Sequence, residues 1–446
     1  MIIIETATRL YYFYHPVVSL FFFFLFMHHL LFIFLFFLNV GCSSYFESAS
    51  DKVTDPSSPT YNESASEKMI DPGSPTDVIV GAERPELYLD KCKGKNVGVV
   101  ANQTSIVNGV HLVDFLVANG VSVKAIFCPE HGFRGNAGAG EHIDDSIDPG
   151  TGIPVISLYG NHRKPTAADL KNLDLVLFDL QDVGVRFYTY ISTLTYVMEA
   201  CADYNVPVII LDRPNPNAHY VDGPVLKSGY ESFVGLHHVP VVYGMTIGEY
   251  GLMVNGEGWL STSSHSGKCN LTVIPIDNYT HATIYRLPVN PSPNLQTMNA
   301  IWLYPTVCLF EGTVVSVGRG TNHPFEIVGH PDLKTGDTIF TPVTIPGVVT
   351  NPKFENTPCK GYSLVNKGIS MRNSSVSFVD IQLVIKLYNE LKVGESFFTP
   401  YFKKLVGSDE LQRQIMSGMS AEKIRSGWQS ELDSFKAIRS KYLIYQ

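Results

Sequence analysis

Short runs of consecutive apolar residues alternate with longer mixed segments between residues 96 and 211. The runs are Asn96–Ala101, Val123–Cys128, Ile153–Leu158, Leu173–Leu180 and Val206–Leu211. Continuous apolar runs of this length are typical of strands that are buried on both faces of a parallel sheet. The segments between them have helical lengths, at Val110–Asn119, Thr166–Asn172 and Tyr188–Tyr204. This alternation predicts an α/β domain with a Rossmann-like parallel sheet covered by helices.

The pattern becomes α+β after residue 217. Thr246–Leu260 is predicted to be a helix, with Thr246 as its N-cap and Glu249 at the capping-box position. Further expected elements are strands at Val273–Asp277, Thr313–Val317 and Glu326–Val328, and helices near 378–393 and 408–417. The proline-rich stretch Pro288–Asn294 indicates a domain boundary. We therefore expect a Rossmann-like domain at residues 86–290 and a smaller auxiliary domain at 291–446.

The first 42 residues form a hydrophobic block that is predicted to be a signal or anchor segment. Its end, from Asn39 to Cys42, is similar to a bacterial lipoprotein cleavage site with Cys42 as the acylated residue, although Asn39 departs from the usual leucine. An uncleaved anchor is the alternative. Residues 43–85 are predicted to be a disordered linker, because most of this stretch is rich in Ser, Pro and acidic residues. We expect an exported protein held at a membrane, on the periplasmic or extracellular face.

Composition narrows the classes of partner. In 446 residues the 33 Lys and Arg are outnumbered by 42 Asp and Glu, so the net charge is −9 and no basic patch for nucleic acid is expected. The seven cysteines show no C-x-x-C pair, and His131 and His142 lie at no recognised metal-ligand interval. The glycine-rich loop 135–140 runs into an acidic segment instead of a helix, which argues against a dinucleotide. The sequence therefore predicts neither a metal nor a cofactor.

Polar clusters follow each of the predicted strands. They begin at Asn102-Gln103, Glu130-His131, Tyr159-Gly160, Gln181-Asp182 and Asp212-Arg213. In a parallel sheet all of these ends lie at the same edge, where ligands of open α/β sheets bind. We expect them to converge on one cleft suited to a substrate rich in hydroxyl groups.

Glu130 is the candidate catalytic residue in this cleft. Glycosyl transfer needs a carboxylic acid that protonates the leaving oxygen, and a partly desolvated cleft edge favours the neutral acid. The alternative is a solvated loop residue that pairs locally with Arg134. A second carboxylate about 5 Å away would imply retention of configuration and one at about 6.5–9.5 Å inversion. The candidates for it are Asp182, Glu141 and Glu326.

Three loop arginines, Arg186, Arg213 and Arg319, are candidates for binding a substrate carboxylate, which a planar guanidinium suits. Surface salt bridges are the alternative. Tyr159 and Tyr188 are expected either to stack on a sugar ring or to close the core.

Six blocks of sequence carry a family resemblance. They read CPEHGFRG (128–135), FDLQDVGVRFYTY (178–190), LDRPNPN (211–217), MTIGEYGLMVNGEGWL (245–260), PSPN (291–294) and FEGTVVSVGRGTNHPFEIVGHP (310–331). In this order they resemble the NamZ-type exo-β-N-acetylmuramidases. The resemblance covers nearly everything from about residue 90 to the end.

The resemblance implies a Rossmann-like catalytic domain with a C-terminal auxiliary domain, and an active site in the cleft between them. It implies hydrolytic release of N-acetylmuramic acid (MurNAc) from the non-reducing end of peptidoglycan fragments such as MurNAc-GlcNAc, without a nucleotide cofactor. The proposed catalytic glutamate falls on Glu130. The other candidate site residues are catalytic His131 and Asp182, and substrate-binding Asn102, Gln103, Arg134, Arg186, Tyr188, Arg213, Asn215, Asn294, Arg319 and Glu326.

Two alternatives to this function stay open. A membrane-tethered protein could bind muropeptides or other glycans without turnover, and an exo-hydrolase could act on another amino sugar. The N-acetyl group of MurNAc also permits substrate-assisted attack, in which no second enzyme carboxylate acts as nucleophile.

Overall fold

Among the residues that the structure describes, seven strands form one sheet in the order β11-β8-β7-β1-β4-β6-β5. The structure is a computed structural model, and it describes residues 78–130, 132–134, 145–263, 267–374 and 376–446. All neighbouring strands are parallel except the edge pair β5 and β6. The strands are β1 (Asn96–Ala101), β4 (Ser122–Cys128), β5 (Ser146–Ile147), β6 (Pro154–Ser157), β7 (Leu175–Asp179), β8 (Val208–Leu211) and β11 (Leu271–Ile274).

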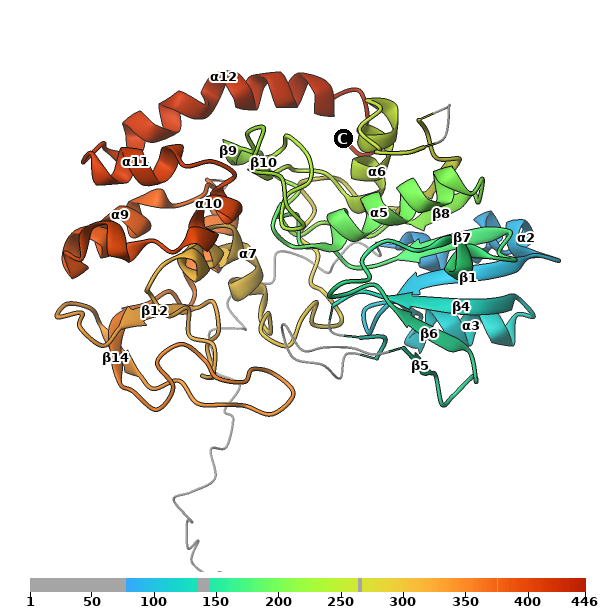
Figure 1. Ribbon diagram of the computed structural model, residues 1–446, viewed down its shortest axis with the longest axis horizontal. Helices are drawn as coiled ribbons and strands as arrows, with labels where there is room; N and C mark the ends of the chain where they lie inside the picture. The colour runs from blue at the N-terminus through green and yellow to red at the C-terminus, as the bar shows by residue number, and fades with distance from the viewer. Residues whose placement is uncertain (1–77, 131, 135–144, 264–266, 375) are drawn as a thin grey trace, which may run out of the picture. The chain divides into compact units, whose positions relative to one another are not determined.

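Both faces of this sheet are buried, as the continuous apolar runs predicted. Along β7, Leu175 and Leu177 pack into one core, whereas Val176 and Phe178 pack into another. The first core contains residues of α2 (Leu89–Cys92) and α3 (Leu112–Ala118), and the second contains residues of α5 (Tyr190–Asp203) and α6 (Ile247–Gly256). Figure 1 shows α3 and α5 on opposite sides of the sheet. The predicted α/β class is confirmed.

Local capping explains where two of the helices begin. In α6 the Thr246 hydroxyl accepts from the backbone N–H of Glu249, and the Glu249 carboxylate accepts from the N–H of Thr246. This is the capping box that the sequence predicted. Thr166 caps α4 (Ala167–Leu170) in the same way. Two short antiparallel pairs complete this part of the chain, β2 (Ile106–Val107) with β3 (Val110–His111) and β9 (Asp222–Val225) with β10 (Pro240–Val242).

The C-terminal part combines a small antiparallel sheet with helices. Its strand order is β12-β14-β13, formed by Ile327–His330, Cys359–Ser363 and Thr338–Phe340. The helices are α7 (Met298–Val307), the 3-10 helix η4 (Cys308–Gly312), α8 (Lys367–Asn373), α9 (Ile381–Leu391), α10 (Pro400–Val406), α11 (Glu410–Met416) and α12 (Ala421–Arg439). The predicted strand at 326–328 and the helices near 378–393 and 408–417 are confirmed within a few residues.

The strand predicted at Thr313–Val317 is wrong. Only isolated bridges occur there, from Thr313 to Phe398 and from Ser316 to Gly329. The Thr313 hydroxyl donates to the carbonyl of Phe310 and accepts from the N–H of Val315. These local bonds compete with strand pairing, as Ser and Thr side chains commonly do.

The core on the α5 side of the sheet continues into the C-terminal helices, so that Leu194 and Met253 share one cluster with Val384 and Phe402. The described residues belong to one compact unit. The division at residues 290 and 291 stays a prediction. Six cysteines lie in the described ranges, and all are buried and unpaired. In the same ranges no helix has both the length and the apolar character needed to cross a membrane.

Candidate active site

A cavity of about 600 Å³ lies where the carboxyl edge of the sheet meets the C-terminal part of the chain. The N-terminal part of the lining comes from the loops after β4 and β6, from residues 187–190 before and in α5, and from 232–234. The C-terminal part comes from residues 292–325, from the loop 349–353 and from α10. Segments far apart in sequence therefore form one site.

Glu130 lines this cavity from the loop that follows β4. The Tyr159 hydroxyl, from the loop after β6, donates to its carboxylate at 3.1 Å. Burial and the charge of Glu130 raise the pKa of Tyr159 to about 12, so Tyr159 stays a donor at neutral pH. Tyr401 of α10 also lines the cavity, and the Glu130 charge contributes to the raised pKa of that phenol after burial. The acid therefore shares the cavity lining with tyrosines from two distant segments.

A group of buried tyrosines forms the floor beside Glu130. The Tyr188 hydroxyl donates to the carbonyl of Pro291 at 2.7 Å, and its ring lies edge-on to that of Tyr190. Both residues line the cavity. Asn102 lies behind them, where its side-chain amide donates to the Tyr190 hydroxyl at 2.7 Å. Asn102 therefore positions a wall residue and does not line the cavity itself.

The second carboxylate among the described lining residues is Glu311, in η4. Arg319 binds it with two hydrogen bonds, of 2.8 and 2.9 Å. Burial opposes ionisation, but the attraction to Arg319 outweighs it and lowers the pKa of Glu311. Arg319, predicted to bind substrate, thus lines the cavity with part of its donors already used.

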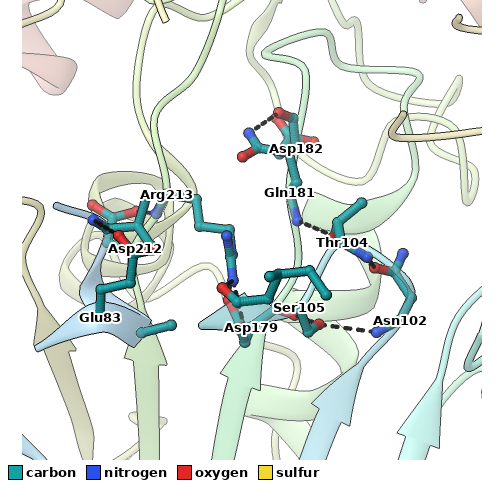
Figure 2. Close-up of polar contacts among 12 residues, drawn as sticks. Glu83, Asn102, Thr104, Ser105, Asp179, Gln181, Asp182, Asp212 and Arg213 are labelled. Carbon is teal, nitrogen blue, oxygen red and sulfur yellow. Dashed lines mark hydrogen bonds and ion pairs between the residues drawn. The ribbon is translucent and has the colours of Figure 1, made fainter. Parts of the chain in front are cut away.

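Several predicted residues belong instead to a polar network at the ends of β1, β7 and β8 and are absent from the cavity lining (Figure 2). Arg213 binds both carboxylate oxygens of Asp179, at 2.5 and 2.9 Å, and is 3% exposed. Thr104 and Ser105 tie the end of β1 to the end of β7 through Gln181 and Asp179. Asn215 is buried nearby and donates to the carbonyl of Met245. The ends of β1, β7 and β8 therefore contact one another, whereas the loops after β4 and β6 reach the cavity.

Asp182 is buried beside this network. The Tyr243 hydroxyl and the N–H of Gly184 donate to its Oδ2, whereas Oδ1 is buried with no partner among the described residues. Burial raises the pKa of Asp182 to about 6 despite these bonds. Asp182 is absent from the lining of the cavity.

Arg186 is completely buried and joins the two parts of the chain. Its guanidinium donates to the carbonyls of Pro224 and Val239 and, in α10, to those of Leu405 and Val406. Burial lowers its pKa to about 9, so it stays charged at neutral pH. Arg186 thereby holds α10, which carries Tyr401, against the loop that carries Tyr188.

The remaining predicted residues lie outside the lining as well. The Gln103 amide donates to the carbonyls of Asn290 and Pro291, and Asn294 donates to that of Val348. Glu326 accepts from Thr297 and Asn299, and Arg134 pairs with Asp114 and Asp148. His131 and Cys42 lie outside the described residues. Their predicted roles stay predictions.

Sequence reasoning missed most of the polar and aromatic lining residues. Among them are Arg163, Phe233, Glu311, Lys353, Tyr401 and Lys404. Arg163 had a usable signal, because it lies four residues after Tyr159 in a loop that follows a predicted strand. The others lie more than 70 residues from Glu130, and no sequence pattern indicates which of them folds back to the sheet edge. In the described ranges no group of three potential ligands could hold a metal.

Comparison with known families accounts for almost all of the described chain. The family described as "Exo-beta-N-acetylmuramidase NamZ, N-terminal" matches residues 97–299. The family described as "Exo-beta-N-acetylmuramidase NamZ, C-terminal" matches residues 302–445.

Individual relatives agree with these matches. The chain is 38% identical over 377 residues to the peptidoglycan beta-N-acetylmuramidase NamZ of Bacillus subtilis, covering 80% of this chain and 89% of the relative. Two crystal structures of DUF1343 family proteins from Bacteroides fragilis are similar, each covering 83% of this chain and 99% of the other. One is 46% identical with a TM-score of 0.76, and the other is 28% identical with a TM-score of 0.67.

Proposed function

The chain belongs to the NamZ family of exo-β-N-acetylmuramidases, and on this basis we propose that it releases MurNAc from the non-reducing end of peptidoglycan fragments of the MurNAc-GlcNAc type. Glu130 is the general acid and base of this reaction. It protonates the glycosidic oxygen as the bond to the leaving sugar breaks, and later accepts a proton from the attacking water.

The position of Glu130 is the observation that carries this proposal. It is the carboxylate that a parallel strand delivers to the wall of the cavity, with a tyrosine donor at 3.1 Å. The cavity is large enough for a sugar ring and is lined by tyrosines suited to stacking on one.

The other lining carboxylate bears on which group attacks the anomeric carbon as the glycosidic bond breaks. Glu311 accepts hydrogen bonds from two N–H groups of Arg319, one on each carboxylate oxygen, which makes it a poor nucleophile. The N-acetyl group of the substrate is then the natural nucleophile, and Glu130 provides the proton transfers. The proposal therefore needs one catalytic carboxylate of the enzyme only.

Incubation of the protein with MurNAc-GlcNAc and analysis of the products by mass spectrometry tests the function. We expect MurNAc and GlcNAc to form, and Glu130→Gln to reduce their formation at least 100-fold, because general acid catalysis contributes about 10²–10⁴-fold. A Glu130→Gln variant that keeps more than about 10% of turnover contradicts the assignment. Binding of MurNAc-GlcNAc without any products would identify a binding protein instead. Faster cleavage of a GlcNAc glycoside would identify a hydrolase of another amino sugar.

We also propose that the protein is exported and held at a membrane by its N-terminal segment. The hydrophobic block before Cys42 and the Ser- and Pro-rich stretch after it support this, and both lie outside the described residues. Fractionation of cells that produce the full chain tests it. Cys42→Ala should release the protein from the membrane if Cys42 is lipidated, and an uncleaved anchor would retain it.

A further inference from the structure

Positive charge exceeds negative charge in the lining of the cavity. The described lining residues include four cations, Arg163, Arg319, Lys353 and Lys404, and two carboxylates, Glu130 and Glu311. Such an excess inside a concave, partly apolar site attracts an anionic ligand. The question is which of the cations has donors left for it.

Two of the four cations are already engaged. Arg319 is bound by Glu311. The Lys353 ammonium donates to the carbonyls of Thr313 and Val315, at 2.6 and 3.0 Å. By contrast, Arg163 and Lys404 form no ion pair or hydrogen bond with any residue that the structure describes. Their N–H donors are available to a ligand.

Of these two cations, Arg163 has the orientation of its side chain restricted by a neighbouring ring. Its guanidinium carbon lies 4.6 Å from the centroid of the Phe233 ring, and Phe233 stacks in turn on Tyr196 of α5, at 5.8 Å. A cation–π contact fixes the plane of the guanidinium and leaves the N–H groups at its edge exposed. Arg163 and Lys404 are both exposed, but Lys404, on α10, has no such aromatic contact among the described residues.

Arg163 and the catalytic acid Glu130 both line the cavity, and Tyr159 links their two segments. Tyr159 lies four residues before Arg163 in the loop after β6, and its hydroxyl donates to the Glu130 carboxylate at 3.1 Å. A ligand that fills the cavity therefore meets both residues.

We propose that Arg163 is the specificity-determining residue of this cavity, and that it binds the lactyl carboxylate of MurNAc through two N–H groups at the edge of its guanidinium. This inference rests on the proposed function, because it assumes that the cavity accepts an amino sugar. MurNAc differs from GlcNAc by this lactyl group, so a cation that binds the carboxylate separates the two sugars. A planar guanidinium is the side chain best suited to bind it with two hydrogen bonds.

The test measures the binding of free MurNAc and free GlcNAc by calorimetry, beside kcat/KM for a chromogenic MurNAc glycoside. Arg163→Gln should weaken MurNAc binding about 10- to 100-fold, the effect of losing hydrogen bonds to a charged group, and leave GlcNAc binding within about twofold. Arg163→Lys should weaken MurNAc binding less than Arg163→Gln does. It keeps the positive charge but lacks the planar guanidinium that forms two parallel hydrogen bonds. Arg286→Gln is the matched control, because Arg286 is exposed and lies outside the lining.

Four results would overturn the proposal. MurNAc affinity could stay unchanged in Arg163→Gln, both sugars could lose affinity equally, or Lys404→Gln could carry the selective loss instead. A wild-type protein without preference for MurNAc would also overturn it. Binding is measured separately from turnover, so a protein that selects MurNAc through Arg163 without cleaving glycosides would refute the proposed function and leave this inference standing.

Discussion

Glu130 and Asp182 both follow strands of the parallel sheet, β4 and β7, and each accepts a hydrogen bond from a tyrosine. Their surroundings differ. Glu130 lines the cavity, whereas Asp182 is 3% exposed and lies among the residues that tie the strand ends together. A carboxylate that follows a strand can therefore either stabilise the fold or line the active site. Its position after a strand in the sequence does not distinguish the two roles.

The largest expected effect separates the two carboxylates by activity. Glu130→Gln should lower kcat for a chromogenic MurNAc glycoside at least 100-fold, whereas Asp182→Asn should keep kcat within about tenfold, because it removes no group from the cavity wall. Steady-state kinetics at equal concentrations of folded protein check this. A loss of 100-fold or more in Asp182→Asn would support the predicted catalytic role of Asp182.

Stability should depend on Asp182 more than on Glu130, the reverse of the effect on activity. Asp182→Ala leaves the Tyr243 hydroxyl and the Gly184 N–H unpaired in the core, so the free energy of unfolding should fall by about 2 kcal/mol. Glu130→Ala should change it by less than about 0.5 kcal/mol, as is common for partly exposed residues. Urea denaturation followed by circular dichroism measures both. Equal losses would mean that Glu130 also supports the fold.

Tyr159 and Tyr243, which donate to Glu130 and Asp182, extend the comparison to single hydroxyl groups. Tyr159→Phe should lower kcat about three- to tenfold with little change in stability, because it removes one donor to the catalytic carboxylate. Tyr243→Phe should cost about 1 kcal/mol of stability and leave kcat unchanged. Both variants need thermal unfolding and kinetic measurements. A kinetic effect confined to Tyr243→Phe would reverse our assignment of the two sites.

The last prediction concerns how stability changes with pH. The pKa of Asp182 is raised by burial from 3.8 to about 6, so the folded protein binds this proton more tightly than the unfolded chain does. The protonated Asp182 carboxyl therefore contributes to the free energy of unfolding. This contribution is fully present below about pH 4 and is lost as pH rises through about 6. Asp182→Asn should therefore flatten the fall in stability between pH 4 and 6, by at most about 1.4 kcal/mol per pH unit. Identical pH profiles of wild type and variant would contradict the raised pKa.

The arginines show the limit of sequence reasoning most clearly. Arg186, Arg213 and Arg319 were selected because they lie in polar loops beside Gly or Pro. The structure buries the first two completely and pairs the third with Glu311. Arg163 lies in a similar loop and keeps its donors available. All four residues lie in loops, so the number of carbonyls and carboxylates that the fold places around each one decides its role.

The sequence by itself determined the parallel sheet, the capped helix α6, the strand-end position of Glu130 and the family. These features depend on local periodicity, capping chemistry and motifs within short windows, which a single chain displays directly. Only the tertiary structure decided which residues line the cavity. Glu311, Lys353, Tyr401 and Lys404 join Glu130 in the lining from more than 170 residues away. Such contacts depend on how helices pack over the sheet edge, and the energy of that packing is spread over the whole core.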